Sequence, residues 1–162
     1  NKYLDKGLIC EDEAIELYNS VYFTSHVKNT ERKEDEYLTG ECDIYTPEKI
    51  IDIKNAWSLQ TFPASPKEAH KKAYEWQGRA YMMLWDVDVF ELAYCIVSTP
   101  PELVGFEDES IHVVDHIPEE MRVTTKLYER DNDLEELIKI KVRAVQKRTQ
   151  EIIDQIVESH GG

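Results

Sequence analysis

The chain has 162 residues, of which 41% are hydrophobic and 32% are charged, and its formal net charge at pH 7 is −14. This length suits one domain with a sizeable core, and the strong negative charge argues against a protein that holds nucleic acid through a broad basic surface. No apolar run approaches the roughly eighteen residues of a membrane-spanning helix, and no secretory leader is visible. We expect a soluble cytoplasmic protein with one domain over residues 1–162. Because the chain starts at Asn1 rather than Met, we also expect that a short native N-terminal segment is missing.

Cysteine spacing and charge distribution narrow the possible classes further. Cys10, Cys42 and Cys95 are widely separated and form no C-x-x-C pair, which predicts reduced thiols and neither a disulfide framework nor a zinc or iron–sulfur site. Residues 102–136 hold twelve acidic and three basic residues, whereas residues 139–148 hold five basic residues and no acidic one. Such a basic run is either a solvated helix face or a local binding surface.

The first third of the chain predicts a helix followed by a β-hairpin. Apolar residues over 11–23 recur at the three-to-four spacing of an amphipathic helix, with Gly7 before it as a flexible entry. Residues 28–35 are charged and lack an apolar period, which indicates a loop. Residues 40–54, GECDIYTPEKIIDIK, hold two short alternating runs around Thr-Pro-Glu-Lys at 46–49. Proline at the second position of this tetrapeptide is typical of a type I turn between two strands.

The loop length fixes the register of this hairpin. If residues 46–49 form the loop, Asp43 lies directly opposite Asp52. By the same register Glu41 lies opposite Lys54, and all four side chains project from one face. Opposed carboxylates repel each other unless a cation lies between them or one is protonated. The cluster is therefore typical of a functional site. The alternative is an exposed polar face that carries an acid pair by chance.

The rest of the sequence predicts further helices and strands around one sheet. Ser65, Pro66 and Glu68 indicate the N-terminus of a helix that runs to Trp85. The other expected elements are a buried central strand over 89–97, a short edge strand over 111–114, a strand over 122–127, and a long helix that is capped by residues 131–133 and carries apolar residues at helical spacing. The fold class is α/β (α+β mixed sheet), with helices packed around the sheet.

The acidic pair and the lysine suggest a particular chemistry. Two opposed aspartates suit Mg²⁺ or Mn²⁺, which favour carboxylate and water oxygens, and a backbone carbonyl near Ile53 could add a ligand. Lys54 lies two residues beyond Asp52 on the same face. Its amine could orient or deprotonate a metal-bound water, or neutralise charge that builds on a phosphate. This combination suggests phosphodiester hydrolysis.

The same residues carry a resemblance to a known family. Gly40-x-x-Asp43, followed after eight residues by Asp52-Ile53-Lys54, resembles the signature of the PD-(D/E)XK nuclease superfamily. The resemblance implies a restriction-endonuclease-like core in which a β-hairpin active site is flanked by helices. It also implies that Asp43, Asp52 and the Ile53 carbonyl bind metal, while Lys54 serves the nucleophile.

Two further motifs resemble the RecB-type and phage lambda-type exonuclease branch of that superfamily. Gly7-x-x-x-Glu11-x-x-Ala14 is similar to its first motif, and Gln77-x-x-x-Tyr81 is similar to its Q-x-x-x-Y helix motif. All motifs stand in family order. The branch implies that Glu11 binds metal or positions water and that Gln77 and Tyr81 lie on the DNA side.

The resemblance implies a metal-dependent deoxyribonuclease, namely an exonuclease on linear double-stranded DNA in phage-type recombination or repair. Mg²⁺ is its expected cofactor, with Mn²⁺ as a substitute. Its expected partners are DNA, a second copy of the chain in a homo-oligomer, and a single-strand annealing protein in a bacterial or phage-infected cell. An acidic nuclease needs a focused basic lining, for which the candidates besides Lys54 are Lys71, Lys72, Arg79 and the basic run over 139–148.

Two other functions are compatible with these residues. The negative net charge favours a non-catalytic DNA-binding or assembly module that keeps a nuclease-like fold, although intact acid, acid and lysine positions argue against loss of catalysis. A site-specific endonuclease would use the same catalytic residues with base-reading loops. Three scattered cysteines cannot build the four-cysteine cluster of the iron–sulfur nucleases, so the clustered form of that subfamily is not expected.

Overall fold

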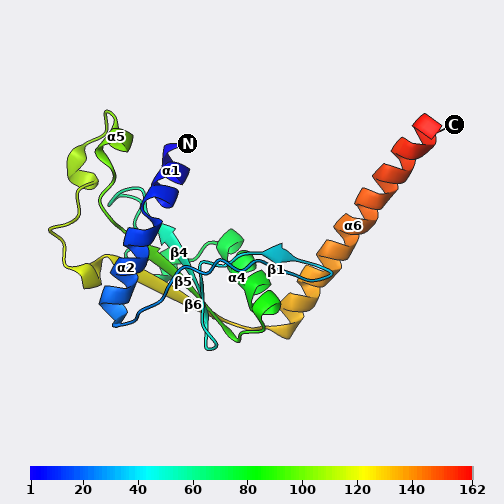
Figure 1. Cartoon of the computed structure of the whole chain (residues 1–162), viewed down its shortest axis with the longest axis horizontal. Helices are drawn as coiled ribbons and strands as arrows, with labels where there is room; N and C mark the ends of the chain where they lie inside the picture. Colours follow the sequence, from blue (N-terminus) through cyan, green and yellow to red (C-terminus); the bar gives the residue numbers. More distant parts are fainter. Residues whose placement is uncertain (162) are drawn as a thin grey trace.

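A mixed four-stranded sheet forms the centre of the computed structural model, which describes residues 1–161 (Figure 1). Its strands, in spatial order, are β3 (Ile44–Tyr45), β4 (Ile50–Asn55), β5 (Val89–Cys95) and β6 (Val123–Glu129). The β4–β5 pair is parallel, whereas β3–β4 and β5–β6 are antiparallel. The mixed sheet and the central position of β5 confirm the predicted fold class.

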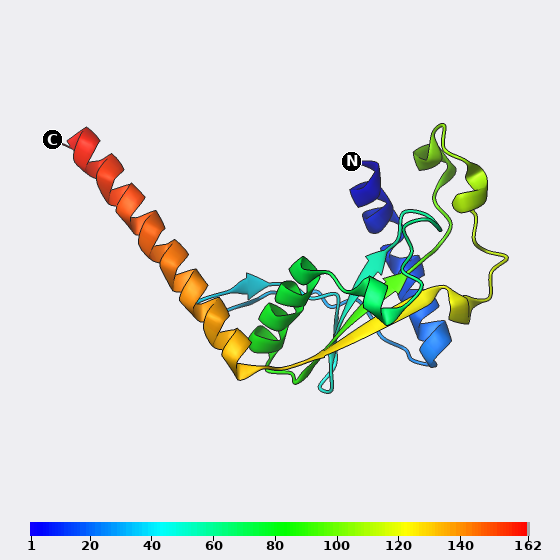
Figure 2. The same cartoon turned by 180° about the vertical axis from the view of Figure 1, so that it is seen from behind.

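Helices cover both faces of this sheet. They are α1 (Lys2–Ile9), α2 (Glu11–Tyr22), α3 (Pro66–Ala69), α4 (Lys72–Trp85), α5 (Pro101–Val104) and α6 (Asn132–Gly161), with short 3-10 turns at Glu109–Ile111 and Glu119–Met121. The apolar face of α2 packs on Ile51, Ile53 and Ala93, while α4 packs on Phe90 and Leu92 from the other side. Accordingly, α2 lies in front of the sheet in Figure 1 and behind it in Figure 2. Since β4 and β5 are parallel, the chain must cross over between them, and α3 with α4 forms this crossover.

The N-terminal half differs from the sequence prediction in three places. Gly7 lies inside α1 instead of in a flexible entry, and nothing crowds the space where its Cβ would be. The expected loop over 28–35 contains β1 (Lys33–Glu34), which pairs with β2 (Thr39–Gly40) as a small ribbon. The helix that Ser65 caps is interrupted, because His70 and Lys71 adopt extended backbone angles. This break lets His70 Nδ1 reach the Tyr128 hydroxyl at 2.7 Å on β6.

The predicted edge strand over 111–114 is wrong. The segment follows a 3-10 turn at Glu109–Ile111. Its backbone forms hydrogen bonds with a neighbouring loop instead of with a strand at the sheet edge. The Thr99 N–H donates to the His112 carbonyl at 3.0 Å, and the Val114 N–H donates to Ser98 Oγ at 2.9 Å. These side-chain and loop contacts satisfy the groups that a strand would have presented to a partner.

The long C-terminal helix α6 begins as predicted but extends away from the sheet (Figures 1 and 2). Asp131 Oδ1 accepts hydrogen bonds from the N–H groups of Asp133 and Leu134, which caps the helix start. Only the first part of the helix packs against other elements, beside α4 and the β1–β2 ribbon. Ile153 and Ile156 are 45% and 53% exposed, so the expectation that the helices pack around the sheet does not hold for the C-terminal part of α6. Within residues 1–161 no helix is both long and apolar enough to span a membrane.

Candidate active site

The β3–β4 hairpin places the two predicted aspartates across from each other. Its observed register pairs Tyr45 with Ile50, as the four-residue loop predicts. The Asp43 carboxylate is directed onto β4, because its Oδ2 accepts the Ile53 N–H at 2.8 Å. The ladder between β3 and β4 ends at Ile44 and Ile51, before Ile53. The Asp43 carboxylate therefore accepts the Ile53 N–H in place of a backbone carbonyl of β3. Glu41 is exposed and lies outside the ladder, so the expected pairing of Glu41 with Lys54 is wrong.

Asp52 is the buried carboxylate of the site, with only 3% of its surface exposed. Lys54 Nζ lies 2.9 Å from Asp52 Oδ2 as an ion pair, but the geometry is not that of a hydrogen bond, and this oxygen has no other hydrogen-bond partner within residues 1–161. Burial raises the pKa of Asp52, and the nearby Asp43 carboxylate raises it further against the opposing effect of Lys54. The site therefore holds a buried carboxylate oxygen whose close polar contact is the Lys54 ammonium.

Lys54 lies between this carboxylate and helix α4. Its Nζ lies 3.5 Å from Gln77 Oε1 and 4.5 Å from the centre of the Tyr74 ring. Burial lowers the pKa of Lys54, but Asp52 outweighs burial and the net pKa is raised. The amine therefore stays charged. Of the roles predicted for Lys54, orienting a water or neutralising a phosphate fits this charge better than accepting a proton from water.

Glu11, Gln77 and Tyr81 reach the same cavity from the helices on either side. Glu11 is in the first turn of α2. Gln77 and Tyr81 are one turn apart on α4, and Gln77 Nε2 donates to the Tyr81 hydroxyl at 2.9 Å. The cavity has a volume of ≈ 590 Å³ and is lined by these three residues together with, among others, Asp43, Asp52, Ile53, Lys54 and Lys71. The tertiary structure thus brings the predicted metal-binding, catalytic and DNA-side residues together.

Solved exonuclease structures share this fold. The crystal structure of a phage-related exonuclease from Haemophilus somnus 129PT matches with a TM-score of 0.89 and 37% sequence identity, over 96% of this chain and 74% of that chain. The chain belongs to this phage-type exonuclease family. Its PD-(D/E)XK resemblance and restriction-endonuclease-like core are thereby confirmed, and it is a nuclease of the exonuclease type.

More distant exonucleases share the fold as well. LHK-Exo, an alkaline exonuclease from Laribacter hongkongensis, matches in two structures, one of them in complex with dAMP. Both have a TM-score of 0.74 at 14% and 16% identity, over 99% of this chain and 75% of each LHK-Exo chain. No protein-family model and no curated protein matches the sequence.

Some of the predicted basic DNA contacts lie away from the cavity of this exonuclease. Arg79 is only 8% exposed; its Nε donates to Glu75 at 2.8 Å and its Nη1 donates to the Glu129 carbonyl at 2.9 Å. A guanidinium held in this way is not available to a phosphate, so the prediction for Arg79 is not supported. The physical reason is the helix period, which turns position 79 away from the face that carries Gln77. Lys72 is exposed and does not line the cavity, and no residue of the basic run over 139–148 in α6 lines it.

Four residues of the site were not anticipated from the sequence. Tyr74 and Tyr94 line the cavity next to Lys54, and Tyr94 is its register neighbour on β5. Tyr74 could have been found, because it lies three residues before Gln77 on the same helix face. Lys28 contacts both Glu11 and Asp43. No pattern in the sequence indicates this position, because the apolar residues around Lys28 do not recur at helix or strand spacing. The fourth residue is Trp57, which follows β4.

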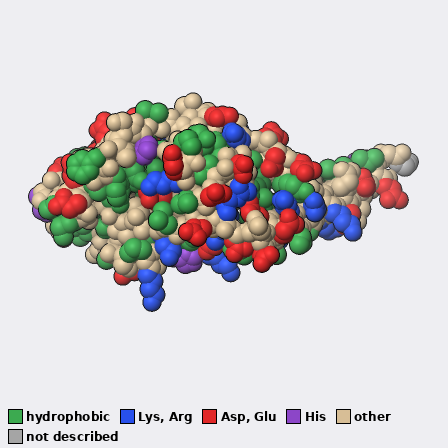
Figure 3. Space-filling view, turned by 90° about the horizontal axis from the view of Figure 1, so that it is seen from below, with side chains coloured by type: hydrophobic (Ala, Val, Ile, Leu, Met, Phe, Trp, Pro, Cys, Tyr) green, Lys and Arg blue, Asp and Glu red, His purple; other side chains and the backbone are tan. Residues whose placement is uncertain are grey.

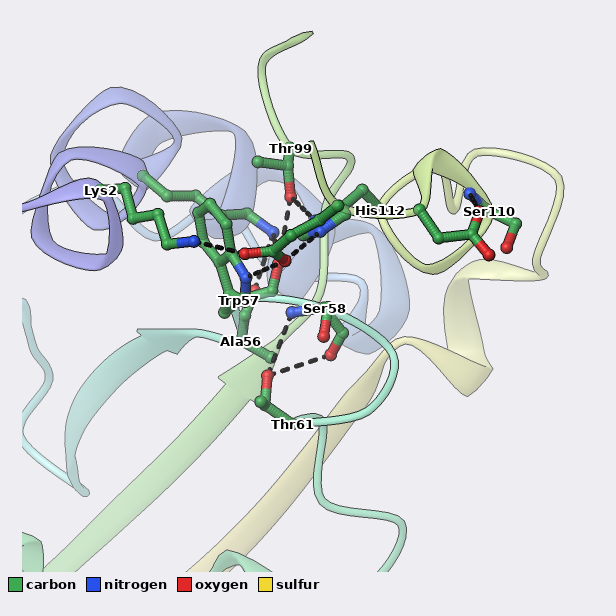
Figure 4. Close-up of polar contacts among 11 residues, drawn as sticks. Lys2, Ala56, Trp57, Ser58, Thr61, Thr99, Ser110 and His112 are labelled. Atoms are coloured by element: carbon green, nitrogen blue, oxygen red, sulfur yellow. Dashed lines mark hydrogen bonds and ion pairs between the residues drawn. The ribbon is translucent and has the colours of Figure 1, made fainter. Parts of the chain in front are cut away.

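A polar network fixes the loop that follows β4 and forms one wall of the cavity (Figure 4). The buried Lys6 ammonium donates to the Ala56 and Trp57 carbonyls at 2.8 and 3.0 Å. Trp57 Nε1 donates to Glu107 at 2.9 Å, and His112 Nε2 lies 2.9 Å from the same Glu107 oxygen. Hydrogen bonds from Lys2, Trp57 and His112 lower the pKa of Glu107 to about 2. This network holds His112 in the loop structure, away from the carboxylates of the site.

Gln77 offers a direct test of how Lys54 is positioned. We expect Gln77→Ala to lower kcat for DNA cleavage by about ten- to a hundredfold, because the Lys54 ammonium loses an oxygen that orients it. KM should change less than kcat. Steady-state kinetics on a linear duplex measures both. Gln150→Ala, at an exposed glutamine of α6, is the matched control and should leave both constants unchanged. Equal kinetics for Gln77→Ala and the native protein would contradict this role.

Proposed function

We propose that this exonuclease hydrolyses linear double-stranded DNA with Mg²⁺, or with Mn²⁺ as a substitute, in phage-type recombination or repair. One observation carries the proposal: the buried Asp52 carboxylate lies in one cavity with Asp43 and with the Lys54 ammonium, which is 2.9 Å from Asp52 Oδ2. Hard oxygen donors of this kind suit Mg²⁺ and Mn²⁺. The dAMP bound in one LHK-Exo structure is a mononucleotide, which supports DNA as the substrate here.

The donor set fits a magnesium ion that keeps part of its water shell. Within residues 1–161 no three His, Cys, Asp or Glu side chains converge closely enough to enclose a metal. Mg²⁺ does not require such an enclosure, since one or two carboxylates with waters and phosphate oxygens commonly complete its octahedron. Asp43, Asp52 and the Ile53 carbonyl would hold the ion, with Glu11 as a further ligand. When bound, it would polarise the scissile phosphate and lower the pKa of a coordinated water.

The other residues of the cavity act on the DNA backbone in this proposal. Lys54 stabilises the negative charge that develops on the phosphate, and Gln77 keeps the ammonium in place. Lys71 is exposed at the cavity rim, with its Nζ 5.6 Å from the Tyr74 ring centre and 5.9 Å from the Tyr94 ring centre. Its charge is available to a neighbouring phosphate. Acidic and basic side chains are interspersed on the face seen in Figure 3. Because the net charge is −14, a few such lysines at the cavity, and not a broad basic surface, would attract DNA.

The substrate assay compares linear duplex DNA with closed circular plasmid in Mg²⁺ and in EDTA. We expect degradation of the linear duplex alone, and only with the metal. Cutting of the circle would point to an endonuclease instead. Degradation of neither substrate in Mg²⁺ or Mn²⁺ would point to the non-catalytic module. A homo-oligomer and a single-strand annealing protein are the further partners that we propose from the family resemblance, and light scattering of the purified protein tests the first.

A further inference from the structure

Lys28 occupies a defined position among the carboxylates of the site. Its ammonium lies 3.0 Å from Glu11 Oε1 and 2.7 Å from Asp43 Oδ1, so one cation bridges residues from α2 and from the hairpin. The lysine side chain is 30% exposed. These distances are those of ion pairs, so Lys28 is a partner of both acids.

The backbone beside Lys28 is held to the hairpin, so this contact is more than a mobile surface ion pair. The Asn29 N–H donates to the Asp43 carbonyl at 2.7 Å, and Asn29 Nδ2 donates to the Cys42 carbonyl at 3.0 Å. These two bonds fix the chain one residue away from the lysine. The ammonium consequently stays within reach of Asp43 whenever the hairpin is folded.

The oxygens that Lys28 contacts belong to the carboxylates that would hold the metal. Three carboxylates, Glu11, Asp43 and Asp52, line this cavity, and within residues 1–161 their ion pairs are with two ammonium groups, those of Lys28 and Lys54. An ammonium and a divalent cation cannot both lie against the same pair of oxygens, because they repel each other at that distance. A metal that takes Glu11 as a ligand must therefore break the Lys28 ion pairs.

We propose that Lys28 competes with the divalent cation for Glu11 and Asp43 and thereby weakens the metal affinity of this exonuclease. The inference rests on the proposed metal-dependent function. Lys28 stabilises the carboxylates before the metal arrives, and its release is part of the free energy of metal binding. Without the lysine, the metal meets uncompensated carboxylates and no competitor. Removing the lysine charge should therefore tighten metal binding by about five- to tenfold, the scale of one or two partly exposed ion pairs.

Mn²⁺ binding in the absence of DNA tests this without reference to activity. The electron paramagnetic resonance signal of free Mn²⁺ gives the Kd, and thermal unfolding with and without Mn²⁺ gives a second readout. Lys28→Met should lower Kd by about five- to tenfold and increase the rise in Tm that Mn²⁺ causes. Lys49→Met is the matched control, because Lys49 is 32% exposed and lies 3.0 Å from Glu91, away from the cavity. It should leave Kd unchanged.

Charge-preserving substitution completes the design. Lys28→Arg keeps a cation that can bind two carboxylates, so its Kd should equal or exceed that of the native protein. A tighter Kd for Lys28→Arg would overturn the proposal even if Lys28→Met did not fold. If the native protein binds Mn²⁺ but Lys28→Met binds it equally or more weakly, the competition is wrong and the metal site stands. If no protein binds Mn²⁺, both the competition and the metal dependence fail.

Discussion

Asp52→Asn is expected to lower the rate of DNA cleavage by at least about a thousandfold, since it removes a charge from the only fully buried carboxylate of the cavity. Asparagine keeps the shape of the side chain but supplies a neutral oxygen, which is a poor ligand for Mg²⁺ next to Asp43. Single-turnover cleavage of a linear duplex measures the loss. Asp12→Asn, at an exposed aspartate of α2, is the control and should cleave at the native rate. Cleavage by Asp52→Asn within tenfold of the native rate would contradict the assigned site.

The stability of the same variant relative to the native protein, measured in EDTA, should increase from pH 5 to pH 8. Burial raises the pKa of Asp52 in the folded state, so the folded protein binds this proton more tightly than the unfolded chain does. The stabilisation by the protonated carboxyl is complete below the ordinary aspartate pKa and is lost as the pH rises toward the raised value. Asparagine does not titrate. The free energy of unfolding of Asp52→Asn minus that of the native protein should therefore be higher at pH 8 than at pH 5, while the lost ion pair leaves the Lys54 ammonium uncompensated at both pH values. Urea unfolding at both pH values measures the difference, and a difference that increases toward pH 5 would contradict the raised pKa.

Gly78→Ala is expected to destabilise the fold by about 2–4 kcal/mol, although alanine is the better helix former. A Cβ at this position of α4 would lie 2.0 Å from Cδ1 of the Phe90 ring, which is fully buried on β5. The helix must move off the sheet or the ring must leave its place in the core. Either shift also displaces Gln77 from the cavity. Urea unfolding in EDTA measures the free energy, and a fall in cleavage should accompany it.

Two further variants isolate the steric cause. Gly7→Ala lies inside α1 with nothing within 4 Å of the added carbon, so it should raise the free energy of unfolding by about 0.5–1 kcal/mol. Phe90→Leu, combined with Gly78→Ala, reduces the clash and should recover part of the stability that Gly78→Ala loses. If the double variant is less stable than the sum of the single effects predicts, contact between position 78 and the Phe90 ring is not the cause.

Local chemistry determines much of the site without any tertiary contact. The four-residue turn fixes the hairpin register, and the register alone places Asp43 across from Asp52. The continuous apolar run at 89–97 predicts a strand with both faces buried, which β5 confirms, and Ser65 predicts a helix start through its own hydrogen bond to the Glu68 N–H. These features depend on backbone geometry and on neighbours within a few residues, which the sequence displays directly.

Only the tertiary structure decided where long side chains and long helices make their contacts. Lys28 comes from a segment without any period, and its ion pairs with Glu11 and Asp43 depend on how α2 and the hairpin meet. Arg79 has the positive charge of a DNA-contacting residue, but its guanidinium donates hydrogen bonds to Glu75 and to the Glu129 carbonyl of β6. The apolar stripe of α6 predicts a buried face but cannot specify which element covers it, and much of it is exposed here. Periodicity records which face of an element is apolar, whereas the partner of that face is set by contacts between residues that are far apart in the sequence.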